Sequence, residues 1–118
     1  MLIGELARES GLTLHTIRFY EKRGLLDTRH MTRRSNNYKE YTPAALERLR
    51  FISQAKSAGF TLSETAQLLR EWDTLNPPER REILLDKIAQ IDRRMAELER
   101  MKSYLSAKIA AIIGEAHP

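Results

Sequence analysis

The C-terminal third of the chain carries a long heptad repeat, which restricts its fold more than any other feature. Between Glu79 and Ile113 no glycine or proline interrupts a helix. Apolar side chains and one lysine recur there at spacings of four and three residues, and we call them the heptad stripe: Leu84, Ile88, Ile91, Met95, Leu98, Lys102, Leu105, Ile109 and Ile112. This spacing is typical of a coiled coil, and one helix of about 50 Å, at ~1.5 Å per residue, cannot bury such a stripe by itself. We therefore expect a dimerisation helix over residues 79–113, and packing of this helix onto its own chain is the alternative.

Two short helices separated by a tight turn are expected at the N-terminus. Apolar residues at helical spacing predict a first amphipathic helix that ends at Gly11: Leu2, Ile3, Leu6 and Ala7. Thr13 then offers an N-cap and Gly24 a left-handed C-cap for a second helix. Two helices this close form a helix-turn-helix, whose second helix enters the DNA major groove. A helical hairpin with a solvated basic face is the alternative.

The expected second helix has two different faces. At about 100° per residue, His15, Arg18 and Lys22 share a polar stripe. Leu14 and Ile17 lie together on an apolar face. We expect the apolar face to pack and the polar face to contact an anionic partner.

Several segments, in the same order along the chain, resemble MerR-family transcriptional regulators. They cover most of residues 1–70: Ile3–Ala7, Thr16–Leu26, Tyr38–Thr42, Leu46–Ile52 and Ala58–Glu64. The resemblance implies a mainly α fold with a winged helix-turn-helix domain followed by a long C-terminal helix that pairs as an antiparallel coiled coil in the dimer. The expected domains are a DNA-binding domain at 1–72, a linker at 73–78, the dimerisation helix at 79–113 and a tail at 114–118.

The resemblance also implies a function. It predicts a homodimeric, sequence-specific regulator that binds double-stranded promoter DNA and bends or untwists an over-long promoter spacer, so that RNA polymerase engages both promoter elements. The residues expected to contact DNA are polar, basic or aromatic and lie in the second helix, the wing and the third helix: Thr13, His15, Thr16, Arg18, Phe19, Tyr20, Lys22, Arg33, Arg34, Tyr38, Lys39 and Lys56. Arg18 is expected to make the most valuable contact and Tyr20 a phosphate hydrogen bond. For Lys56, a solvated lysine is the alternative.

The wing is expected to be a β-hairpin. Asn36 and Asn37 can supply its tight turn, with Asn37 at positive φ. Relatives usually carry Gly-Tyr-Arg here, so Asn37 and Lys39 are departures, and a lysine favours phosphate contact over bidentate recognition. Three further helix starts are expected from their capping residues: Thr42 before Pro43, Thr61 with Glu64, and Asn76 with Glu79.

The distribution of charge agrees with a polyanionic partner. Residues 1–60 carry 11 Lys and Arg against 6 Asp and Glu, a net charge of +5, and the remainder carries 9 against 10, a net charge of −1. A basic half favours binding to phosphates, with a merely solvated basic surface as the alternative. No apolar run is long enough for a membrane span and no secretory signal is recognisable, so we expect no membrane partner and a location in the cytoplasm.

Several functions are excluded or disfavoured by residue usage. The absence of cysteine excludes disulfides, thiolate metal sites and redox-sensing thiols within this sequence. The histidines His15, His30 and His117 lack ligand-like spacing, so no metal and no cofactor is expected. No catalytic set stands out, and an enzyme is the least favoured class.

The effector is not predicted. Metal-sensing relatives place cysteines at the dimerisation helix, and this sequence leaves little after that helix for a drug-binding domain. Either a small molecule binds between the helices of the dimer or the protein acts without an effector. A non-regulatory architectural DNA-binding protein and a coiled-coil interaction module are the competing functions.

Overall fold

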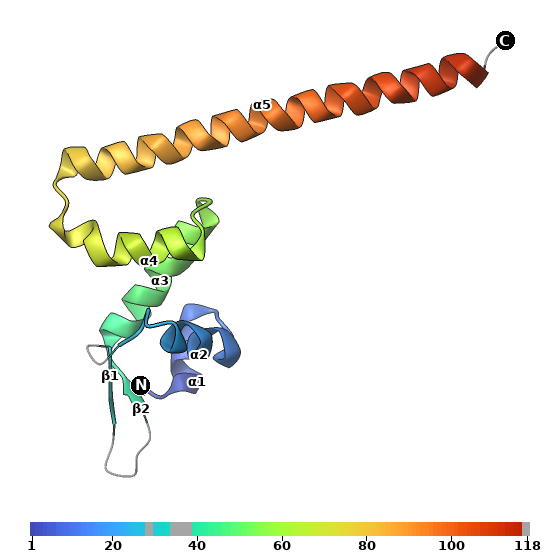
Figure 1. Ribbon diagram of the computed structural model, residues 1–118. Coiled ribbons are helices and arrows are strands. Elements are labelled where there is room, and N and C mark those ends of the chain that lie inside the picture. The colour runs from blue at the N-terminus through green and yellow to red at the C-terminus, as the bar shows by residue number, and fades with distance from the viewer. Residues whose placement is uncertain (28–29, 34–38, 117–118) are drawn as a thin grey trace. The chain divides into compact units, whose positions relative to one another are not determined.

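The computed structural model describes residues 1–27, 30–33 and 39–116, and for residues 32, 33 and 116 it describes the backbone alone. The elements in Figure 1 are α1 (Ile3–Ser10), α2 (Leu14–Lys22), β1 (Met31–Arg33), β2 (Lys39–Tyr41), α3 (Pro43–Ser57), α4 (Leu62–Glu71), the 3₁₀ helix η1 (Trp72–Thr74) and α5 (Pro77–Ala116). They form two compact units, Met1–Thr74 and Leu75–Pro118. The boundary between the units therefore falls inside the stretch expected to be a linker.

The helix-turn-helix is built by α1 and α2. Gly11 ends α1 at φ 73°, and its N–H donates to the Ala7 carbonyl oxygen at 2.9 Å. Two residues later the Thr13 hydroxyl oxygen accepts a hydrogen bond from the Thr16 N–H at 3.1 Å and so caps α2. The predicted turn and cap are confirmed.

A Schellman motif ends α2. Gly24 lies at φ 79°, where its N–H donates to the Glu21 carbonyl oxygen at 3.1 Å. The Leu25 N–H donates to the Tyr20 carbonyl oxygen at 2.9 Å, and both of these side chains are in the hydrophobic core. The glycine predicted at this position therefore turns the chain out of the recognition helix and into the core.

The wing consists of β1 and β2. The two strands are antiparallel and pair Met31 with Tyr41, Thr32 with Glu40, and Arg33 with Lys39. The backbones of Met1 and Tyr41 are also joined. The Tyr41 N–H donates to the Met1 carbonyl oxygen at 2.6 Å, and the Met1 amino group donates to the Tyr41 carbonyl oxygen at 2.8 Å. The predicted hairpin is confirmed in its strands.

The turn between these strands cannot be compared with its prediction. Asn36 and Asn37, proposed as the turn residues, lie outside the described residues, and so do Arg34 and Tyr38.

A second helical pair, α3 and α4, follows the wing. Pro43 begins α3 as expected, but the Thr42 side chain does not cap the helix. Its hydroxyl instead donates to the His30 carbonyl oxygen at 3.2 Å, which ties the start of α3 to the wing. At α4 the predicted capping box is confirmed, with Thr61 and Glu64 exchanging hydrogen bonds of 2.9 and 3.1 Å.

The hydrophobic core of the first unit joins these elements. Its buried side chains come from α1, α2, the segment after α2, β2 and α3: Leu6, Ile17, Tyr20, Leu25, Leu26, Tyr41, Ala45, Leu49 and Ile52. Tyr20 and Tyr41 supply the aromatic part of this core. Because one side of α2 is buried against α1 and α3, its other side is left to solvent.

The second unit contains α5, a helix of 40 residues. Asn76 and Glu79 form its capping box through hydrogen bonds of 2.9 and 3.1 Å. The helix begins at Pro77 and ends at Ala116, so the predicted bounds of 79–113 were too short at both ends. Prolines are compatible with a first helical turn, where no intrahelical donor is needed, and Gly114 does not end the helix.

The predicted fold class is confirmed: the described chain is mainly helical, with an N-terminal helix-turn-helix and a long C-terminal helix. Of the described helices, none is both long and apolar enough to cross a membrane.

Replacing Gly24 tests the end of the recognition helix. We expect Gly24→Ala to lower the free energy of unfolding by about 1–2 kcal/mol, because a residue with a Cβ is strained in the left-handed region. No heavy atom would lie within 4 Å of that Cβ, so the loss is conformational rather than a clash. Urea denaturation at a fixed protein concentration measures it.

Gly4→Ala is the matched control. Gly4 lies inside α1, also with open space around a Cβ, and alanine has the higher helix propensity. It should leave stability unchanged or raise it, and an equal loss in both variants would contradict the assignment.

Candidate nucleic-acid interface

The exposed side of α2 is a cationic surface, which we call the α2 outer face. Its exposed members are His15, Arg18, Phe19, Lys22 and Arg23, the last at the C-cap of the helix. They recur at intervals of three and four residues and so share one side of the helix. Three permanent cations on a single exposed face suit contact with phosphates and base edges.

Arg23 is a member of this face that the sequence analysis did not select. It follows Phe19 by four residues, a spacing that could have placed it on the same face. Its guanidinium carbon lies 5.6 Å from the centroid of the Phe19 ring.

Leu14 differs from its prediction. The sequence placed it with Ile17 on a buried apolar face, but Leu14 is 40% exposed whereas Ile17 is fully buried. Leu14 is the first residue of α2, and the core contacts begin only one turn later, at Ile17. Helical spacing gave the correct side for Ile17 but did not show where the core ends.

Tyr20 belongs to the core more than to the surface. It is 4% exposed, and the Lys56 ammonium nitrogen lies 6.0 Å from the centroid of its ring. The structure thus brings together two residues of the predicted set from α2 and α3. Lys56 itself is exposed. The phosphate contact of Tyr20 stays a prediction, and only the small exposed part of this residue could make such a contact.

A carboxylate connects α2 to the wing. Glu21 Oε2 accepts a hydrogen bond from the Lys39 ammonium, with which it forms an ion pair. Glu21 Oε1 accepts a hydrogen bond from the Tyr41 hydroxyl at 2.5 Å. Both partners come from β2, and they lie 18 and 20 residues from Glu21 in the sequence. We call this set of three residues the Glu21 clamp.

Burial explains why this carboxylate needs its two partners. The Glu21 side chain is 12% exposed, and an ionised carboxylate removed from water is stable only when paired and hydrogen-bonded. The Lys39 side chain is 36% exposed, so solvent screens part of its attraction. The charge of Lys39 is therefore already matched within the protein, and the phosphate contact predicted for Lys39 stays a prediction.

The remaining wing residues of the predicted set are only partly described. The backbone of Arg33 lies opposite Lys39 at the outer end of the strand pair. The side chain of Arg33 is not described, and Arg34 and Tyr38 lie outside the described residues. Their contacts with DNA stay predictions.

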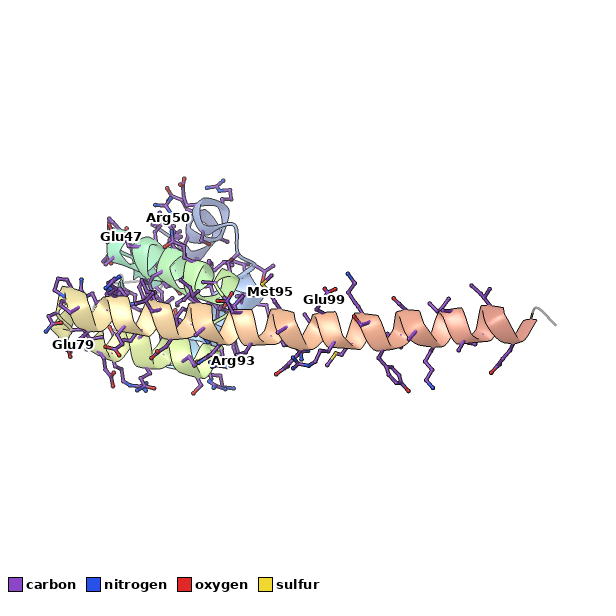
Figure 2. All side chains as sticks on the ribbon, turned by 90° about the horizontal axis from the view of Figure 1, so that it is seen from above. Glu47, Arg50, Glu79, Arg93, Met95 and Glu99 are labelled. Carbon is purple, nitrogen blue, oxygen red and sulfur yellow. The ribbon has the colours of Figure 1, made fainter. Side chains whose placement is uncertain are left out.

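The heptad stripe of α5 lies open along the helix. Its eight apolar side chains are between 42% exposed, at Ile91, and 63% exposed, at Ile112, and Lys102 is exposed as well. Figure 2 shows side chains projecting all along α5, with Met95 of the stripe and Glu99 labelled. An exposed apolar stripe of this length is typical of a helix that packs against another helix.

The described side chains do not suggest a metal centre. Among them, no group of three or more His, Cys, Asp and Glu residues could hold a metal ion.

A helix-turn-helix followed by a two-stranded wing and a second helical pair defines a winged helix-turn-helix protein. The family model described as MerR HTH family regulatory protein matches residues 1–72, and the one described as MerR, DNA binding matches residues 46–108. The chain belongs to the MerR family of transcriptional regulators. The predicted membership is thereby confirmed.

Individual relatives agree with this membership. The HTH-type transcriptional regulator CueR of Escherichia coli O157:H7 is 37% identical over 120 residues, which cover 98% of this chain and 85% of the relative. The crystal structure of the transcription regulator PbrR691 from Ralstonia metallidurans CH34 in complex with lead(II) matches with a TM-score of 0.76 at 34% identity, covering 89% of this chain and 82% of that one.

A third relative shares the fold. The structure of HiNmlR, a MerR family regulator lacking the sensor domain and bound to promoter DNA, matches with a TM-score of 0.64 at 23% identity. The match covers 93% of this chain and 83% of that one.

The Glu21 clamp can be tested by a double-mutant cycle. We expect Glu21→Gln and Lys39→Met each to weaken binding to promoter DNA, because each loosens the wing relative to α2. The double variant should lose less than the sum, with a coupling of about 0.5–3 kcal/mol between the two sites. Fluorescence anisotropy of a labelled promoter fragment, beside thermal unfolding, measures both effects.

Glu47→Gln makes the same change of charge at an exposed position of α3 and serves as the control. Strictly additive losses from the Glu21 and Lys39 substitutions would show that the clamp does not support DNA binding.

Proposed function

We propose that this protein is a homodimeric, sequence-specific transcriptional regulator that binds double-stranded promoter DNA through the α2 outer face and the wing. The observation that carries the proposal is the cationic outer face of a helix whose opposite side is fixed in the core. Its membership in the MerR family supports the same function. The HiNmlR structure, described as lacking the sensor domain and bound to promoter DNA, is an example of DNA binding by this fold without such a domain.

The second part of the proposal is the dimer. Two copies of α5 would bury the heptad stripe of each in the other, and one copy alone leaves it in water. We propose antiparallel pairing, on the resemblance to the family and on the position of Lys102. In a parallel pair Lys102 would face its own copy, whereas in an antiparallel pair it meets another level of the partner helix and extends its charge to the edge.

The proposed effect on DNA follows from a fixed spacing. A pair of 40-residue helices, each about 60 Å long at ~1.5 Å per residue, would join two copies of α2 in one dimer, and we propose that the bound dimer presents them to DNA at one preferred separation. A promoter whose half-sites do not match this separation has to bend or untwist to meet both, and its deformability then contributes to specificity. RNA polymerase would engage the two promoter elements of the deformed spacer.

Regulation by an effector would not use thiols of this sequence, which has no cysteine. Two modes of regulation remain as alternatives. Either a small-molecule effector binds between the helices of the dimer, or the protein acts without an effector and is controlled by its abundance. The proposed location is the cytoplasm, with the protein on the nucleoid when bound to DNA.

Selection of bound genomic fragments, followed by transcription from the most enriched promoter in vitro, tests the function. We expect enrichment of one short two-fold symmetric sequence and a change in transcript level on adding the protein. Uniform capture of all fragments, without an effect on transcription, would instead identify an architectural protein. If the protein captured no DNA, a coiled-coil interaction module would be the remaining candidate function.

Arg18 gives the sharpest test of the recognition helix. We expect Arg18→Ala to cost about 1–3 kcal/mol of operator affinity and to relax preference at one operator position if the guanidinium contacts a base. A phosphate contact would weaken all sequences alike and lower the slope of log K against log salt by about one.

Arg93→Ala is the matched control for charge, since Arg93 is exposed on α5 outside the heptad stripe. Operator affinity that is unchanged in Arg18→Ala would reject the role of Arg18.

Leu98 tests the dimer. We expect Leu98→Asp to dissociate it, because a carboxylate would enter the apolar interface, and to lose operator affinity at the same time, because one copy contacts one half-site. Lys102→Leu should keep the dimer or strengthen it. Sedimentation of both variants beside operator binding at fixed salt measures the two effects together.

A Leu98→Asp protein that stays dimeric would show that α5 is not the dimer axis. The absence of cysteine also lets single-cysteine variants report the direction of pairing. Ile112→Cys should form a disulfide across a parallel pair only, because the two copies of this position lie at opposite ends of an antiparallel one.

A further inference from the structure

Phe19 is an aromatic side chain within the cationic α2 outer face. It is 41% exposed, directly follows Arg18, and lies four residues after His15 and four before Arg23. Single exposed apolar residues are common on protein surfaces and need no explanation by themselves. This one differs because it is the only apolar member of the face proposed to enter the DNA major groove.

Two groups of the described chain lie near the Phe19 ring. The Arg23 guanidinium carbon lies 5.6 Å from its centroid, and the Tyr20 ring lies 6.0 Å away at an interplanar angle of 49°. Tyr20 is in the core, so one neighbour of the ring is a rigid part of the fold. The other part of the ring stays open to a ligand, since Phe19 is 41% exposed.

The chemistry of a phenyl ring restricts what it can recognise. It has no hydrogen-bond donor or acceptor, so it cannot bond to a base edge or to a phosphate oxygen. On the major-groove edges of the four base pairs, the one apolar group is the 5-methyl group of thymine. The cations on both sides of Phe19 would hold the phosphates of the same groove.

We propose that Phe19 is a specificity-determining residue that contacts a thymine 5-methyl group in each half-site of the operator. This inference rests on the proposed function and adds to it the class of base that the ring selects. Two other roles for Phe19 predict different behaviour: packing on deoxyribose, and holding Arg23 against a phosphate. Both would contribute affinity without distinguishing thymine from uracil.

Replacement of single operator thymines by uracil tests the proposal, because uracil lacks only the methyl group and keeps the hydrogen-bonding edge. For the wild-type protein, replacement at one symmetric pair of positions should weaken binding about fourfold per half-site, the value for one buried methyl group. Replacement at the other thymines should have little effect. The operator is the sequence selected from genomic fragments.

The same scan with variants of Phe19 connects the methyl group to the ring. In Phe19→Ala the ratio of affinities for the thymine and uracil operators at that pair should fall to about one, whatever happens to overall affinity. Phe19→Tyr, which keeps the ring, should retain the ratio. Leu14→Ala is the matched control, because Leu14 is the other exposed apolar residue of α2 and should leave the ratio as in wild type.

The possible results are distinguishable. If the wild type selects an operator but no uracil replacement weakens binding, the proposal for Phe19 is wrong while the proposed function stands. The proposal for Phe19 is also overturned if the loss of affinity on uracil replacement persists in Phe19→Ala, or if it disappears in Leu14→Ala. If the wild type selects no operator, the proposed function itself fails.

Discussion

The carboxylate of Glu21 joins the two surfaces that are proposed to meet one DNA duplex, the α2 outer face and the wing. Its two oxygens accept hydrogen bonds from the Lys39 ammonium and the Tyr41 hydroxyl, which link the end of α2 to β2. Tyr41 is also bonded through its backbone to Met1, which precedes α1. A small two-stranded wing has few contacts of its own, and this partly buried polar group, together with the core, helps to position it.

The clamp has an electrostatic consequence for DNA binding. Because Lys39 is already paired with Glu21, a phosphate that approached it would have to compete with an internal carboxylate. In the proposed complex, most of the attraction for the polyanion would therefore come from the α2 outer face, where Arg18 and Lys22 are exposed. In this proposed division of roles, Lys39 would position the wing and α2 would supply the charge.

Local patterns were predictable from the sequence, and contacts between distant residues were not. The caps at Thr13, Thr61 and Asn76 were correct because each depends on residues three positions apart. In the Glu21 clamp, Lys39 and Tyr41 follow Glu21 by 18 and 20 positions in the sequence, and no periodicity indicates pairs at such separations. Helical spacing also cannot show where a core ends, so it did not anticipate the exposure of Leu14 or the burial of Tyr20.

The two surfaces proposed to act in regulation differ in how they depend on salt. The heptad stripe is apolar at eight of its nine positions, so its pairing would be driven by the removal of hydrocarbon from water, which salt does not screen. The α2 outer face would bind by displacing counterions from phosphates, and that contribution falls steeply as salt rises. The proposed dimerisation and DNA binding would therefore depend on different forces in this chain. A dimer that persisted after salt had released it from DNA would keep its two recognition helices in one assembly, so each search for an operator would begin with both half-site surfaces present.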